Sequence, residues 1–293
     1  MKLKRTTLAG ISLALVFLFF NGAYRLLGSV SQNEYSLIIF IELLSFLIPT
    51  ALLILVPDGE PVKLRLKPFN RKSLGFVIKS SFAISFLSVL LNFFVSFAIG
   101  SFPGAGVTSE MPAASGGVLF AVISVALVPA LSEELYMRGA FFSSYEHLGT
   151  GTAILMSALS FALIHVSAYN FFGPFAAGLL YAYLTYTLDS IWPAVIAHGL
   201  NNLYSLIMNS LMQKYTAFGL WPYFMVLNLF CLLIFAYIAL NSLEKLTRKG
   251  TVKKFQKGSR NTPASLFETI LSPGFLLFML LFISRIFLKL FAS

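Results

Sequence analysis

Long apolar stretches fill most of this chain, and they constrain its fold more than any other feature. A helix that crosses the hydrocarbon core of a bilayer needs about 20 mainly apolar residues. Nine stretches of about that length occur, at 7–28, 36–56, 74–100, 117–145, 152–169, 172–188, 191–212, 220–242 and 266–290. Only 11% of the residues are charged, against roughly 25% in soluble domains. The sequence therefore predicts an all-α, polytopic membrane helical bundle of about nine transmembrane helices.

The positive charge of the chain is concentrated on one predicted side of the membrane. The net charge is +10, and most Lys and Arg residues lie in the N-terminal MKLKR and in the loops 57–73 and 243–265. The opposite loops, 29–35 and 101–116, contain neither Lys nor Arg. Because cytoplasmic loops carry an excess of basic residues, we expect a multi-pass protein of the cell membrane with a cytoplasmic N-terminus. We interpret the basic residues as setting the orientation of the protein in the membrane and as attracting membrane lipid. We expect no nucleic acid partner.

Ionisable side chains occur inside the predicted spans of residues 117–212. Such groups are costly in a bilayer and usually mark a functional site. The first set lies in LSEELYMRG, where Glu134 and Arg138 are four residues apart. This spacing places both on one helix face and favours an ion pair. Glu133 points elsewhere on the same helix, so we expect it to remain available for chemistry.

Two further motifs follow in later spans. In SFALIH, His165 follows Phe161 by four residues, and in HGLNN the same spacing separates His198 and Asn202. At 1.5 Å per residue, Glu133 and His165 lie roughly 18–20 Å from the cytoplasmic ends of their spans, and the HGLNN pair roughly 10–17 Å. The motifs therefore predict one intramembrane site with a carboxylate, two imidazoles and an amide.

The residue types alone leave two chemistries open for this site. A carboxylate and a histidine can act on a water as a general base, while a second histidine and an amide donate hydrogen bonds to an oxyanion. Alternatively, Glu133, His165 and His198 match a common set of catalytic zinc ligands. The sequence has no H-E-x-x-H motif and no G-x-S-x-G motif, which disfavours the usual metalloprotease and serine hydrolase arrangements.

The three motifs together resemble those of a known protein family. EELYMR, FALIH and HGLNN are similar to the E-E-x-x-x-R, F-x-x-x-H and H-x-x-x-N motifs of the CAAX prenyl endopeptidase and bacteriocin-processing (Abi, CPBP) intramembrane proteases. The resemblance covers residues 117–212. It implies a core protease domain there, between N-terminal transmembrane helices in 1–116 and C-terminal transmembrane helices with a basic cytoplasmic loop in 213–293.

The resemblance also implies an activity and a role for each motif residue. The expected activity is hydrolysis of a peptide bond in a membrane-associated peptide or protein, of the prenylated or leader type. Glu133 would activate the water with help from His165, and His198 and Asn202 would bind the oxyanion. Bacterial members of the family are also linked to bacteriocin immunity, so a non-catalytic membrane scaffold or an immunity or regulatory protein is the alternative function.

The remaining motif positions would have supporting roles, which the resemblance gives to Glu134, Arg138 and Phe161. We expect no cofactor, with zinc as the alternative. Two further ionisable residues are interpreted as structural: Glu42, near the outer end of its span, as exposed at the membrane interface, and His147 as a residue of the membrane edge.

Overall fold

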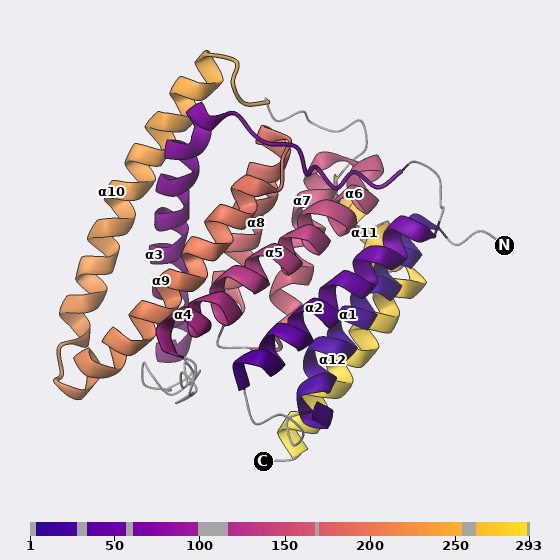
Figure 1. The fold of residues 1–293 in the computed structure, drawn as a ribbon, viewed down its shortest axis with the longest axis horizontal. Helices are drawn as coiled ribbons and strands as arrows, with labels where there is room; N and C mark the ends of the chain where they lie inside the picture. Colours follow the sequence, from indigo (N-terminus) through magenta and orange to yellow (C-terminus); the bar gives the residue numbers. More distant parts are fainter. Residues whose placement is uncertain are drawn as a thin grey trace.

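The computed structural model describes residues 4–27, 34–56, 61–98, 117–167, 170–253 and 262–291. Over these residues the protein is helical and contains no strand, which confirms the predicted fold class. The loop 101–116 and most of the loop 29–35 lie outside the described residues. The longer helices run alongside one another as a bundle (Figure 1).

The helices follow the predicted apolar stretches closely. Their bounds are α1 (Arg5–Leu27), α2 (Glu34–Leu55), α3 (Leu74–Ala98), α4 (Gly117–Val122), α5 (Val128–Glu134), α6 (Phe142–Tyr145), α7 (Thr150–Ile164), α8 (Phe172–Leu188), α9 (Trp192–Ala217), α10 (Trp221–Arg248), α11 (Thr262–Ile270) and α12 (Pro273–Phe291). Helices α4, α5 and α6 are parts of one long helical stretch, joined by the π-helical segments η2 (Ile123–Leu127) and η3 (Leu135–Phe141). Short 3-10 turns, η1 (Arg71–Ser73) and η4 (Glu146–Leu148), precede α3 and follow α6.

The predicted number of nine transmembrane helices is not confirmed. Within the described part of the chain, five helical stretches are long and apolar enough to cross a membrane. A sixth is formed if Pro263–Ile270 and Pro273–Leu288, which meet at an angle of 67°, make one broken span. The difference arises at three helices. Two of them, α7 and α8, have 15 and 17 residues and are therefore shorter than an ordinary span. The third, α9, is long enough at 26 residues but is not among the helices apolar enough to cross a membrane.

The helices that carry the motifs lie in the middle of the bundle, together with α8. Helices α5, α7, α8 and α9 lie between a pair formed by α3 and α10 and a group formed by α1, α2 and α12 (Figure 1). The closest approach in that group is between α1 and α12, where a Cβ on Gly10 would collide with the backbone of Gly274. Glycine is needed there because only a residue without a side chain allows two helices so close together.

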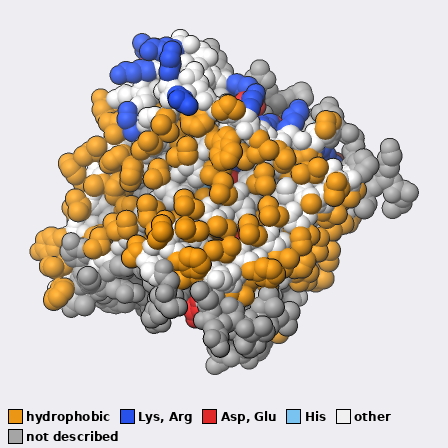
Figure 2. Space-filling view, in the orientation of Figure 1, with side chains coloured by type: hydrophobic (Ala, Val, Ile, Leu, Met, Phe, Trp, Pro, Cys, Tyr) orange, Lys and Arg blue, Asp and Glu red, His pale blue; other side chains and the backbone are white. Residues whose placement is uncertain are grey.

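Basic side chains gather at one end of the bundle. Figure 2 shows hydrophobic side chains over the middle of one face and Lys and Arg side chains along its upper edge. Lys67 and Lys253, from the two predicted basic loops, both form ion pairs with Asp189 at the end of α8. Lys4, from the N-terminal basic segment, lines a cavity together with Lys63. The three basic segments therefore lie at the same end, as their predicted placement requires.

Candidate active site

The helical stretch that carries the two adjacent glutamates is not regular. The π-helical segments η2 and η3 lie on either side of α5, and π-helical turns are frequent at functional sites. Pro129, at the start of α5, has no N–H to donate to the carbonyl of Val125 four residues earlier. Asn202 of α9 donates to this carbonyl through Nδ2 at 3.3 Å. The proline therefore leaves a carbonyl available to Asn202, and this hydrogen bond connects α9 to the helical stretch that carries the two glutamates.

Glu134 and Arg138 form the predicted ion pair. Nε of Arg138 lies 3.1 Å from Oε2 of Glu134, and both side chains are completely buried. The contact is electrostatic rather than an aligned hydrogen bond, because neither atom has a hydrogen-bond partner. The other carboxylate oxygen, Oε1, accepts a hydrogen bond from Nδ1 of His198 at 2.8 Å. Glu134 therefore joins a cation on its own helix to an imidazole on α9.

Two aromatic rings enclose the ends of this triad, which consists of Arg138, Glu134 and His198. The guanidinium of Arg138 lies over the rings of Phe161 and Tyr181, at 4.7 and 5.3 Å from their centroids. The His198 ring stacks on Tyr181 with centroids 5.3 Å apart and meets the edge of Phe161 at 5.5 Å. Tyr181 has no place in the three motifs. Its ring contacts both Arg138 and His198. The spacing of residues in the sequence does not predict these contacts.

His165 lies at the end of α7, where the helix stops. Its Nδ1 donates to the carbonyl of Phe161 at 2.8 Å. The ring also meets the edges of Phe161 and of Phe20 from α1, with centroids 5.2 and 6.0 Å apart. A carbonyl can only accept, so this hydrogen bond places a proton on Nδ1 and leaves Nε2 of the neutral ring as an acceptor.

Glu133, unlike its neighbour Glu134, forms no ion pair with any residue that the structure describes. Its side chain is buried, with 3% exposure, and its Oε2 has no hydrogen-bond partner among the residues that the structure describes. It lies close enough to His198, Glu134 and Arg138 to interact with them electrostatically, and therefore near the triad. The two glutamates thus have different surroundings: Glu134 is engaged by a cation and an imidazole, whereas Oε2 of Glu133 is left without a partner among the described residues.

A residue from outside the motif region also reaches this area, and here the prediction is wrong. Glu42 was expected at the membrane interface, but it is 6% exposed and lies against Ser132, close enough to Glu133 for their charges to interact. The cause is the packing of α2 against α5 and η3, which turns this carboxyl inward. A single sequence indicates how far along its helix a residue lies. It does not indicate which other helix packs against that residue.

The alternative zinc ligands are not gathered into a metal-binding group. Among the described residues, no three His, Cys, Asp or Glu side chains are arranged to hold a metal ion. No hydrogen bond or ion pair joins the described side chains of Glu133 and His165, and Nδ1 of His198 is already engaged by Glu134. The described side chains in this arrangement therefore do not fit a zinc ion.

Comparison with known proteins agrees with the motifs. Residues 115–204 match the sequence model of the Rce1-like family, described as type II CAAX prenyl endopeptidase Rce1-like. The matched segment includes every motif residue from Glu133 to Asn202. Searches among curated proteins and among solved structures gave no match. With its apolar helices, the chain is therefore a membrane protein, and its residues 115–204 are similar to the Rce1-like family of type II CAAX prenyl endopeptidases.

Proposed function

We propose that this protein is an endopeptidase that cleaves membrane-associated peptides or proteins with a water activated by Glu133. The observation that carries the proposal is the contrast between the two adjacent glutamates. Glu134 is engaged through both oxygens, whereas Glu133 is buried with Oε2 unpartnered. An unpartnered carboxylate oxygen in a buried site is available to take a proton from water.

His165 is the second group proposed to act on the water. Its Nδ1–H is committed to the carbonyl of Phe161, so Nε2 can accept a hydrogen bond from the nucleophile. The edge contacts with Phe161 and Phe20 keep the ring from rotating. Holding a reacting group in one orientation removes part of the entropic cost of the reaction.

His198 and Asn202 are proposed to bind the oxyanion of the tetrahedral intermediate. With Nδ1–H of His198 directed at Glu134, Nε2 is the nitrogen left for the substrate, and it donates to the oxyanion in the imidazolium form of the ring, in which both nitrogens carry a proton. The Asn202 amide has two N–H donors, one of which is used by the carbonyl of Val125. Donors already held in place before the reaction stabilise developing charge most effectively.

These roles complete a balanced hydrolysis. Water attacks the scissile carbonyl carbon while Glu133 accepts its proton, and the carbonyl oxygen becomes the oxyanion. The intermediate collapses with cleavage of the C–N bond, and the proton passes from Glu133 to the leaving amine. One water is consumed, and a new carboxyl group, which keeps the second proton of the water, and a new amine are formed without any cofactor.

The expected substrate is a prenylated or leader-type peptide or protein that reaches the site from the membrane. Large hydrophobic side chains remain exposed on α2, α10 and α12, as on a surface that contacts lipid tails. We further propose the cell membrane as the location, with the N-terminus and the gathered basic segments in the cytoplasm. Membrane lipid and the peptide substrate are then the partners.

The proposal is tested with the full-length protein purified into lipid vesicles. Wild type and Glu133→Gln are incubated with membrane-anchored and prenylated peptides, with and without a strong chelator, and products are mapped by mass spectrometry. We expect cleavage at a defined bond by wild type alone and no effect of the chelator. Loss of cleavage with chelator and its recovery with zinc would contradict the metal-free mechanism. A cellular phenotype that persists in Glu133→Gln would contradict the enzyme and favour a scaffold.

A further inference from the structure

A cavity of about 390 Å³ opens at the basic end of the protein, and none of the motif residues lines it. Its volume falls within the range of roughly 300–1,000 Å³ typical of small-ligand sites. Its walls come from four separate parts of the chain: the start of α1, the extended segment 61–69, the turn η4 with the adjoining end of α6, and α11. The charged side chains of the cavity are Lys4, Arg5, Lys63, Glu146 and Glu268.

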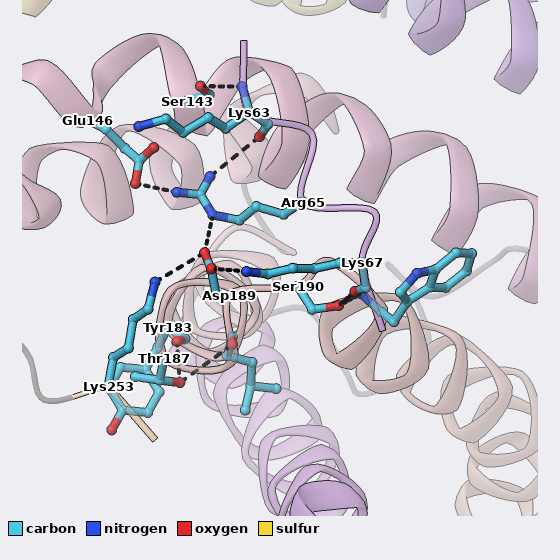
Figure 3. Close-up of polar contacts among 12 residues, drawn as sticks. Lys63, Arg65, Lys67, Ser143, Glu146, Tyr183, Thr187, Asp189, Ser190 and Lys253 are labelled. Carbon is cyan, nitrogen blue, oxygen red and sulfur yellow. Dashed lines mark hydrogen bonds and ion pairs between the residues drawn. The ribbon is translucent and has the colours of Figure 1, made fainter. Parts of the chain in front are cut away.

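The backbone at Lys63 is held firmly at the edge of this cavity. Its N–H donates to Oγ of Ser143 at 2.9 Å, and its carbonyl accepts from Nη1 of Arg65 at 3.4 Å (Figure 3). Arg65 has a positive φ of 52° and forms ion pairs with Glu146 and Asp189. These contacts hold the backbone of Lys63 at the wall of the cavity, while the residue itself is exposed.

The cavity has a surplus of positive charge. Glu146 is already paired with Arg65. Neither Lys4 nor Lys63 forms an ion pair with any residue that the structure describes, so two ammonium groups are left to bind an anion. Glu268, on α11, lines the same cavity. A carboxylate has several acceptor positions, so Glu268 can accept a hydrogen bond from a hydroxyl group of the bound anion in addition to the partner that it already has.

We propose that this cavity binds the phosphate of a hydroxyl-bearing lipid headgroup, as in phosphatidylglycerol, through Lys4 and Lys63. Basic pockets between membrane helices at the cytoplasmic side are suited to anionic headgroups. The location at the polar end of α1, beside the apolar bundle, lets the acyl chains remain in the bilayer while the phosphate enters the cavity. The site is distinct from the peptidase site, and its occupancy does not depend on peptide cleavage.

Native mass spectrometry of the full-length protein in neutral detergent, titrated with phosphatidylglycerol, tests this site. The variant is Lys4→Gln/Lys63→Gln, and the matched control is Lys72→Gln/Lys249→Gln, which removes two exposed lysines from outside the cavity. Because each lysine near a phosphate contributes to headgroup binding, we expect the first lipid to bind the cavity variant about tenfold or more weakly. The control should bind it as wild type does.

Two results would overturn the proposal. Equal weakening in the cavity variant and the control would assign lipid binding to the general surface charge, and unchanged binding in the cavity variant would exclude these lysines as ligands. A parallel titration adds inorganic phosphate to the lipid-bound wild type. Retention of the lipid supports a headgroup site, whereas displacement by phosphate at equal concentration would assign the cavity to a soluble phosphate compound. Unfolding midpoints of the variants establish that each remains folded.

Discussion

Nδ1 of His198 lies 2.8 Å from Oε1 of Glu134, although the two residues are 64 positions apart in the chain. Through its other oxygen, Glu134 is paired with Arg138. Glu134 is therefore the junction between the glutamate-bearing helix and α9. The adjacent Glu133 has no such partner for its Oε2. Two neighbouring residues of one type thus have different environments, and we expect different consequences when each is replaced.

Replacing Glu134 should reduce stability strongly. In Glu134→Gln the completely buried guanidinium of Arg138 loses its counter-charge. Breaking a buried ion pair by removing one partner costs about 3–5 kcal/mol. The measurement is the free energy of unfolding in mixed detergent micelles, followed by tryptophan fluorescence.

The protein contains a matched control for this variant. Glu244 and Arg248 form a second Glu–Arg pair with the same spacing of four residues, but their side chains are 58% and 78% exposed. Glu244→Gln should therefore change the free energy of unfolding by only about 0.5 kcal/mol. Similar losses for both variants would show that burial of the Glu134 pair has no special role.

The ring of Tyr181, rather than its hydroxyl, should matter to the site. Tyr181→Phe keeps the stacking on His198 and the contact with Arg138. It also removes a buried hydroxyl that has no hydrogen-bond partner in the described part of the chain, so the stability of the variant should equal or exceed that of wild type. Tyr181→Leu removes both ring contacts and should cost about 1–2 kcal/mol. In assays of folded protein, Leu should lower the cleavage rate while Phe preserves it; a strong loss with Phe would instead implicate the hydroxyl.

Close packing of α7 against α8 should make Gly178 intolerant of a side chain. A Cβ at this position would lie 2.9 Å from Cα of Ala158, which is backbone and cannot rotate away. Gly178→Ala should therefore destabilise the protein by about 1–3 kcal/mol. Gly75→Ala is the control, because a Cβ there meets nothing within 4 Å, and helix propensity predicts a gain of about 0.5–1 kcal/mol. The measurement is the thermal unfolding midpoint of each variant. Midpoints of Gly178→Ala and Gly75→Ala that both rise or both fall relative to wild type would contradict this account.

The contacts of the site were only partly predictable from the sequence. The pair formed by Glu134 and Arg138 follows from helical spacing, which acts within one element. The hydrogen bond from His198 and the inward position of Glu42 depend on which helices become neighbours, and spacing within one helix carries no such information. Tyr181 is one of many aromatics in 169–186. Only the fold shows which of those rings faces the triad.

The fold, like the site, was only partly predictable from the sequence. Apolar length located the helices well, since each predicted stretch corresponds to a helix or to a group of consecutive helical segments. It could not show that the last stretch bends by 67° between α11 and α12. It also gave no sign of the extended segment at 61–69, because its anchors are distant polar groups such as Ser143 and Asp189.

Acid should weaken the ion pairs that Asp189 forms with Arg65, Lys67 and Lys253. Asp189 lies outside the candidate membrane spans. Partial burial alone would raise the pKa of Asp189, but hydrogen bonds from Lys67 and Lys253 outweigh it and lower this pKa from 3.8 to about 2. A carboxyl with a lowered pKa stabilises the fold above its unfolded-state pKa, and this contribution is lost as the pH falls towards the folded-state value. The unfolding midpoint of wild type should thus exceed that of Asp189→Asn above about pH 4, and the difference should shrink between pH 4 and 2. A difference that is independent of pH would contradict the ionic account.

The most direct test of the central claim is the cleavage rate of Glu133→Gln, measured in lipid vesicles and normalised to the folded fraction. If Glu133 takes the proton from the water, the rate should fall by about 10²–10⁴-fold, while the unfolding midpoint stays close to that of wild type. Cleavage by folded Glu133→Gln at the wild-type rate would contradict the account, because the unpartnered oxygen of Glu133 would then have no part in the reaction.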